Sequence, residues 1–268
     1  MIRTDNNVCI SKYIYNKTFK IKTKDIFQYE RNFDIEMNNK LYNVDYLNFG
    51  TDGIIRDILF LNKNKKIFFE EPTYMMVPKY SKEFNLTRTS FEEADVVYVS
   101  YPNGAKLTLP NFEIKKYNKT IILDLSYYIY LCDNFEEFLD FANKCKQLGY
   151  FVLFGASKIL GLAGLRVGMC LCNNKEIFNE IHQPWQITSV SKVILDKLWN
   201  PKTINKHLKV IKNSKKFFQE KFKKYIKFET QGPFLALSKD FKLPYKEFAR
   251  DYGDYYRFSI VDKKLLKI

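Results

Sequence analysis

Short apolar runs alternate with longer amphipathic stretches through the middle of this 268-residue chain. A glycine turn opens a helical pattern at residues 50–61, and a second helical pattern at residues 136–149 ends on a glycine. The apolar runs have the length and composition of strands and lie at residues 65–72, 96–102, 120–125, 150–154 and 167–172. Such alternation is typical of parallel strands joined by helices. We therefore predict an α/β fold, with a mainly parallel mixed sheet flanked by helices.

The two ends of the chain follow a different pattern. Residues 1–45 and 199–268 carry more lysine and alternate less clearly, and residues 206–227 place apolar side chains close to helical spacing. We predict a large domain at residues 46–198. Residues 1–45 and 199–268 would then form an N-terminal arm and a small α+β lobe.

Composition narrows the class of protein. With 46% hydrophobic residues the chain can bury a sizeable core. No apolar run approaches the roughly 18 residues of a membrane span, and the N-terminus lacks the apolar segment of a signal peptide. The five cysteines contain no Cys-x-x-Cys pair and there are only two histidines, so we expect no zinc site. We expect a cytoplasmic protein with reduced thiols, no metal and no membrane association, and with Cys170 and Cys172 on opposite faces of their strand.

The formal net charge of +14 raises the question of a nucleic-acid partner. Much of the lysine lies in residues 63–66 and 206–227, and an amphipathic helix with a solvated lysine face accounts for the second group. No nucleic-acid-binding motif accompanies the charge. We therefore do not expect a nucleic-acid partner, although nucleic-acid binding by charge alone stays open as a rival hypothesis.

Four of the ten glycines fall within the sequence GASKILGLAGLRVG, residues 155–168, between two predicted strands. Glycine lets the backbone turn tightly and approach a ligand closely. In an open α/β sheet, ligands gather at the carboxyl ends of the strands, where this loop begins. The other strand ends and the helix start at residue 50 contribute Thr51, Asp52, Tyr74, Asn103, Asp124 and Tyr127. A helix start for an anion, an aromatic plate, a carboxylate and the amine of Lys158 are the parts needed to hold a phosphorylated, aromatic, aldehyde-bearing cofactor.

The order of these segments resembles the fold-type I enzymes that use pyridoxal 5′-phosphate. The resemblance is to the histidinol-phosphate aminotransferases and the related threonine-phosphate decarboxylases, in a shortened form, and covers roughly residues 29–257. The sequence SKILGLAGLR is similar to the family's SKxxGLAGLR signature. The sequences that resemble the family's other motifs, in the same order along the chain, are GTDG, PTY, DLSY, ARD and YRFSI.

The resemblance implies that three residues act directly on the pyridine ring and its aldehyde. Lys158 would form the Schiff base and carry a proton, and Asp124 would pair with the ring nitrogen. Tyr127 would hydrogen-bond the phenolic oxygen. We take these three as the catalytic residues.

The resemblance implies a second set that binds the cofactor without taking part in proton transfer. Ser157 and Arg166 would bind the phosphate together with the backbone N–H groups of Thr51 and Asp52, with the Asp52 carboxylate turned outward. Tyr74 would stack on the ring. Where the family has a second Asn, an ungapped match places Gly104. The contact to the phenolic oxygen would then come from Asn103 through a shifted turn, or be absent.

Substrate binding is implied for two arginines near the C-terminus. Arg257 would bind a substrate carboxylate, and Arg250 would hold a second anionic group such as a phosphate. Tyr29 loosely matches a tyrosine that reaches the neighbouring subunit in this family, which implies a homodimer.

Several functions are compatible with these residues. The first is an aminotransferase acting on an amino acid or amino-acid phosphate and a 2-oxo acid, and the second is a decarboxylase of a phosphorylated amino acid. The third is a shortened, cofactor-free relative that serves as a binding partner, but the presence of Lys158, Asp124 and Arg166 together argues against it.

Overall fold

The computed structural model of the chain describes residues 14, 43–181, 187–242 and 248–265. Its main feature is a seven-stranded sheet in the order β1-β7-β6-β5-β4-β2-β3. The strands are β1 (Tyr46–Phe49), β2 (Lys66–Phe69), β3 (Thr87–Arg88), β4 (Val96–Ser100), β5 (Thr120–Asp124), β6 (Phe151–Gly155) and β7 (Val167–Leu171). Pairings β2–β3, β2–β4, β4–β5 and β5–β6 are parallel, whereas β7 runs antiparallel to both β1 and β6. The prediction of a mainly parallel mixed sheet is confirmed.

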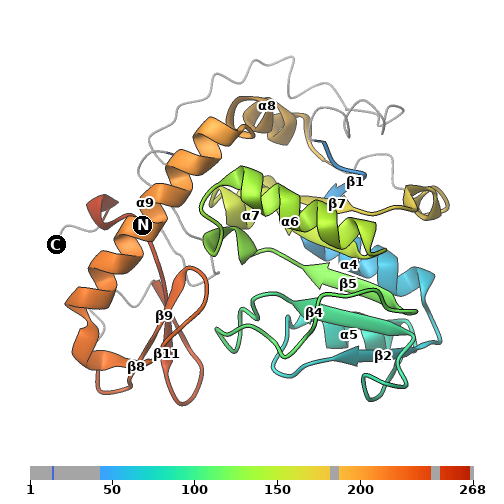
Figure 1. Ribbon diagram of the computed structural model, residues 1–268, viewed down its shortest axis with the longest axis horizontal. Coiled ribbons are helices and arrows are strands. Elements are labelled where there is room, and N and C mark those ends of the chain that lie inside the picture. Colours follow the sequence, from blue (N-terminus) through green and yellow to red (C-terminus); the bar gives the residue numbers. More distant parts are fainter. Residues whose placement is uncertain (1–13, 15–42, 182–186, 243–247, 266–268) are drawn as a thin grey trace.

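Helices cover both faces of this sheet (Figure 1). They are α4 (Gly50–Leu61), α5 (Met76–Glu83), α6 (Phe135–Gln147), the short α7 (Ala156–Ile159) and α8 (Ser189–Leu198). Apolar side chains of α4 and α5 pack in one cluster with one face of the sheet, and those of α6 and α8 pack in another with the opposite face. Strands β4, β5, β6 and β7 are therefore buried on both sides, which is why they appear in the sequence as continuous apolar runs.

The four described cysteines form no disulfide. The expectation that Cys170 and Cys172 face opposite ways is wrong. Residues two apart along a strand share a face, and both thiols lie in the cluster under α4.

The small lobe is an antiparallel sheet in the order β10-β11-β9-β8, preceded by one long helix, α9 (Pro201–Lys221). The strands are β8 (Ile226–Phe228), β9 (Phe234–Leu237), β10 (Ala249–Asp251) and β11 (Tyr256–Ser259). The predicted helix over residues 206–227 is wrong at both ends. Asn200 caps α9 through a 2.9 Å bond from the Thr203 N–H, and the chain has turned into β8 by Ile226.

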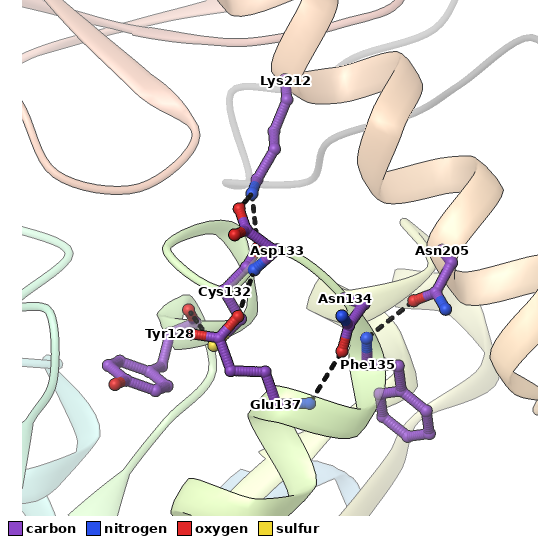
Figure 2. Close-up of polar contacts among 8 residues, drawn as sticks. All are labelled: Tyr128, Cys132, Asp133, Asn134, Phe135, Glu137, Asn205 and Lys212. Carbon is purple, nitrogen blue, oxygen red and sulfur yellow. Dashed lines mark hydrogen bonds and ion pairs between the residues drawn. The ribbon is translucent and has the colours of Figure 1, made fainter.

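The helix α9 runs from the large sheet to the small one (Figure 1) and is fastened to the start of α6 (Figure 2). The Asn205 side-chain oxygen on α9 accepts the Phe135 N–H at 2.7 Å, while Asn134 caps the same helix end. Lys212 of α9 lies 3.4 Å from the Asp133 carboxylate. Because the Phe135 N–H bonds to a side chain of α9, this long helix contributes to the N-terminal cap of α6.

Candidate active site

A cavity of about 520 Å³ opens at the carboxyl ends of β4, β5 and β6 and reaches the small lobe. Every predicted site residue within the described part of the chain lines it: Thr51, Asp52, Tyr74, Asn103, Asp124, Tyr127, Ser157, Lys158, Arg166, Arg250 and Arg257. Tyr29 lies outside the described residues. Segments more than 200 residues apart in the sequence therefore meet around one space.

One wall of the cavity is built from the start of α4 and the Arg166 loop. Arg166 adopts a left-handed conformation (φ 49°, ψ 49°), and its guanidinium lies so close to Gly50 that a Cβ there would be 2.6 Å from Nη2. A Cβ on Gly168 would lie 2.1 Å from the Gly50 carbonyl carbon. The Gly50 N–H donates to the Arg166 carbonyl at 2.9 Å, and no side chain caps α4. The next N–H groups, of Thr51 and Asp52, therefore lie beside an arginine-lined space suited to an anion.

Ser157 adds a second polar group beside this wall. Its hydroxyl oxygen is buried and has no hydrogen-bond partner among the described residues. A buried hydroxyl without a partner is destabilising, and a bound acceptor would remove that penalty. The location of Ser157 at the start of α7, lining the same cavity, indicates where such an acceptor would lie.

Asp124 ends β5 at the floor of the cavity and is only 7% exposed. Its Oδ1 accepts the Ser126 N–H at 2.9 Å, and its Oδ2 accepts the Tyr98 hydroxyl at 2.8 Å. Burial and the adjacent Asp124 charge raise the pKa of Tyr98 well above its ordinary value, so the phenol remains a donor. The carboxylate is thus held by two donors in a fixed orientation.

Tyr74 lies at the mouth of the cavity, beside Asp52. The hydroxyls of Tyr74 and Tyr80 both point to the Asp52 carboxylate, at 3.4 and 3.1 Å. Burial and the neighbouring charges of Asp52 and Asp124 raise the pKa of Tyr74. The same two causes, burial and the Asp52 charge, raise the pKa of Tyr80 to about 12. Two phenols therefore hold the Asp52 carboxylate at the start of α4.

Lys158 is anchored through its backbone. Its carbonyl oxygen accepts the Tyr130 hydroxyl at 2.6 Å, and its Nζ lies 5.5 Å from the centre of the Tyr127 ring. Tyr127 packs edge-on against Phe234 of the small lobe, with ring centres 4.9 Å apart. The amine is therefore placed beside an aromatic ring that both lobes hold in position.

In the turn after β4, the side-chain amide of Asn103 is bonded to the protein itself, which favours the alternative in which it makes no contact to the phenolic oxygen. Asn103 Oδ1 accepts the N–H groups of Ala105 and Lys106 at 2.9 and 3.0 Å, and Nδ2 donates to the Pro72 carbonyl at 3.0 Å. Next to it, a Cβ on Gly104 would be 2.6 Å from Tyr127 Cε2. The Asn103 amide therefore stabilises the turn, and Gly104 leaves room for the Tyr127 ring.

Two arginines enter the cavity from the small lobe. Arg257 on β11 is paired directly opposite Arg250 on β10 and is 1% exposed. Its Nη1 donates to the Gly104 carbonyl, and its guanidinium lies over the rings of Phe234 and Tyr252, at 5.0 and 4.6 Å. Two cross-strand positive charges with aromatic support form a surface suited to anionic groups.

Sequence reasoning missed several residues that line this cavity or support it. Tyr98 appears in the sequence only as one more apolar residue of a strand, and Tyr252 only as one of 19 tyrosines. The signal for Tyr98 is its pairing geometry with β5, which the sequence does not display. Ser126 contributes through its backbone N–H, which carries no residue-specific signal.

Comparisons with known proteins agree with this arrangement. A family model described as aminotransferase class I and II matches residues 96–234, about half of the chain. A histidinol-phosphate aminotransferase of Thermoanaerobacter sp. (strain X514) is 26% identical over 195 residues, which are 62% of this chain and 54% of that protein. The chain spans about half the length of the relatives it matches in sequence.

Two solved structures share the fold. The crystal structure of the histidinol-phosphate aminotransferase from Clostridium acetobutylicum superposes with a TM-score of 0.74 at 21% identity, covering 97% of this chain and 94% of that one. The Sinorhizobium meliloti enzyme of the same name, crystallised in complex with pyridoxal 5′-phosphate, gives a TM-score of 0.66 at 13% identity, covering 89% and 80%.

Proposed function

Because this chain belongs to the aminotransferase class I and II family, we propose that it is a pyridoxal 5′-phosphate-dependent aminotransferase. It would transfer an amino group between an amino acid, or an amino-acid phosphate, and a 2-oxo acid. The observation that carries the proposal is the meeting of the Lys158 amine, the Asp124 carboxylate and the Arg166 guanidinium around one cavity. An amine, a carboxylate and a phosphate-binding cation are the three groups that such a cofactor requires.

The cavity fits a phosphorylated ligand. The Ser157 hydroxyl is buried without a partner among the described residues, and the uncapped start of α4 lies against Arg166. A phosphate is the acceptor that satisfies all three groups, since it offers several oxygens and matches the charge of the helix end. Ser157, Arg166 and the backbone of Thr51 and Asp52 would hold it.

When bound, pyridoxal phosphate supplies an aldehyde that bonds to amines and a ring that withdraws electrons from the attached carbon. Asp124 would hold a proton on the ring nitrogen, since its carboxylate is already fixed by two donors. Tyr74 would cover the ring face and reduce access of water. Tyr127 would donate its hydroxyl to the phenolic oxygen. The Lys158 amine would accept and return the proton of the substrate's α-carbon.

The small lobe would recognise the substrate. Arg257 would orient an acidic group by paired hydrogen bonds, exchanging its bond to the Gly104 carbonyl for a carboxylate or phosphate oxygen. Arg250, directly across the strand pair, would hold a second negative charge. A substrate with two anionic groups is therefore favoured over one with a single anionic group.

We also propose a homodimer. Phe49 and Met75 are 51% and 68% exposed; Met75 lines the cavity, and Phe49 directly precedes the lining residue Gly50. Apolar side chains gathered at a functional opening are typical of an interface. A second copy of the chain would cover them. Light scattering that shows a fully active monomer would contradict this.

We also propose that the protein is cytoplasmic. The four described cysteines are buried and form no disulfide, as expected in a reducing compartment such as the cytoplasm. Within the described ranges no helix is long and apolar enough to cross a membrane.

A substrate screen tests the proposed activity. The purified protein, saturated with pyridoxal phosphate, would be assayed with amino acids and their phosphate esters in the presence of 2-oxo acids. Formation of a new amino acid and 2-oxo acid is the expected result, and Lys158→Ala should abolish it. Release of carbon dioxide without amino transfer would contradict transamination and favour decarboxylation of a phosphorylated amino acid.

A further inference from the structure

The hydroxyl of Tyr98 lies 2.8 Å from Asp124 Oδ2, and Tyr98 is not among the residues that line the candidate active-site cavity. We propose that Tyr98 is a positioning residue that holds the Asp124 carboxylate in a fixed orientation. The inference rests on the proposed function, because Asp124 matters only if a ring nitrogen binds to it. Tyr98 acts through Asp124 and need not touch the substrate or the cofactor.

The strand register explains why this residue reaches the site. Ser100 is paired with Asp124 across β4 and β5, so Tyr98 lies two residues earlier on the same face of the sheet. Two residues of a strand rise about 6.6 Å, which is close to the length of a tyrosine side chain. The ring therefore runs along the sheet surface, and its hydroxyl emerges at the level of the carboxylate.

The environment makes this hydrogen bond strong. Tyr98 is 1% exposed and Asp124 is 7% exposed, so water competes little for either group. A donor to a carboxylate favours its charged form and offsets the desolvation that burial imposes. With Oδ1 held by the Ser126 N–H and Oδ2 by Tyr98, the carboxylate cannot rotate freely. The remaining lone pairs keep a fixed direction for a third donor.

The chain offers a matched control. Tyr46 is 2% exposed, and its hydroxyl donates to the buried Asp57 carboxylate at 2.9 Å. Tyr46 and Tyr98 pack in the same apolar cluster under α4, but neither Tyr46 nor Asp57 lines the cavity. Tyr46→Phe therefore removes the same kind of bond from the same kind of environment, without touching Asp124.

The experiment compares the unmodified protein, Tyr98→Phe and Tyr46→Phe, each loaded with pyridoxal phosphate. We would measure kcat and KM for the best amino donor from the screen, the pH profile of kcat, and the visible absorption of the bound cofactor against pH. The other charged or titratable groups around the cavity stay unchanged in both variants, notably Asp52, Tyr74, Tyr127, Lys158, Arg166, Arg250 and Arg257.

Tyr98→Phe should lower kcat about 10- to 100-fold, the range expected for one hydrogen bond to a charged group, with KM near that of the unmodified protein. The absorption spectrum of its bound cofactor should also change, because Asp124 loses one of the two donors that fix its orientation. Tyr46→Phe should lower thermal stability but leave the pH profile and the spectrum unchanged.

A second variant distinguishes the loss of the hydrogen bond from a folding defect. Fluorotyrosine placed at position 98 preserves the packing and keeps a phenol that donates to Asp124, so kcat and the cofactor spectrum should stay near those of the unmodified protein. If Tyr98→Phe also gives the kcat and the spectrum of the unmodified protein, the positioning role is wrong while the proposed function stands. If the unmodified protein neither binds pyridoxal phosphate nor transfers an amino group, the proposed function itself fails.

Discussion

The guanidinium of Arg166 packs directly on the α-carbon of Gly50, at the first residue of α4. A methyl group on Gly50 would lie 2.6 Å from Arg166 Nη2, and Gly50 has a φ of +75°. The first turn of a helix and a positive charge are thus held together at the position where a phosphate would bind.

The first prediction concerns this contact. Gly50→Ala should lower the free energy of unfolding by roughly 1–2 kcal/mol, because of the left-handed backbone, and should also weaken pyridoxal phosphate binding by displacing Arg166. Gly149→Ala is the matched control, since Gly149 has a φ of +92° with nothing within 4 Å of the added carbon. Cofactor titration would show weaker binding for Gly50→Ala only. Equal binding in the two variants would contradict the phosphate site.

Ser157→Ala should stabilise the cofactor-free protein but weaken its binding of pyridoxal phosphate. Without cofactor the variant should be more stable by about 1 kcal/mol, because a buried hydroxyl that lacks a partner among the described residues is removed. With cofactor it should bind pyridoxal phosphate more weakly, because one donor to the phosphate is lost. Thermal unfolding with and without the cofactor measures both. A loss of stability in the cofactor-free protein would show that the hydroxyl has a structural partner.

Asp124→Asn should lower kcat while leaving most of the binding of pyridoxal phosphate intact. Asparagine fits the same space and can still bond to Tyr98, so the fold and most cofactor binding should persist. Without the negative charge the ring nitrogen is not kept protonated, and kcat should fall at least about 100-fold. Steady-state kinetics at saturating pyridoxal phosphate tests this. Unchanged kcat would rule out the role assigned to the carboxylate.

His207 of α9 predicts how stability depends on pH. The residue is fully buried, and burial lowers its pKa to about 4 from an ordinary value near 6.5. Above pH 6.5 both the folded and the unfolded chain carry a neutral imidazole. As the pH falls from 6.5 to 4, only the unfolded chain takes up the proton, so stability declines by up to about 3 kcal/mol.

The difference between two unfolding titrations isolates this effect. The unmodified protein and His207→Leu would be unfolded in urea between pH 8 and pH 4. The free energy of unfolding of the unmodified protein minus that of His207→Leu should fall as the pH falls below 6.5. A difference independent of pH would mean that the imidazole has the same pKa in the folded and the unfolded chain.

Much of the sheet was predictable because its strands other than β1 and β3 are apolar runs between polar loops. The strand prediction at residues 120–125 differs from β5, Thr120–Asp124, by one residue. The helix at residues 206–227 was misjudged because its apolar spacing continues past Lys221, where tertiary pairing with β9 turns the chain into β8. Local periodicity does not report such pairing.

The cavity-lining residues were predictable where a motif marks them, as with Lys158 and Arg166. Tyr98 was not, because its role depends on the register of β4 against β5, which joins residues 26 positions apart. The environment of Asn103 was also not predictable. Its hydrogen bond to the Pro72 carbonyl joins two loops, and the space at Gly104 depends on where Tyr127 packs.

The most direct measurement is to identify the residue that bonds to the cofactor. The protein would be incubated with pyridoxal phosphate, reduced with borohydride, digested and analysed by mass spectrometry, with Lys158→Ala treated in parallel. The account predicts the reduced cofactor on the peptide that contains Lys158 and no specific adduct in the variant. A label on other lysines, or none on the unmodified protein, would contradict it.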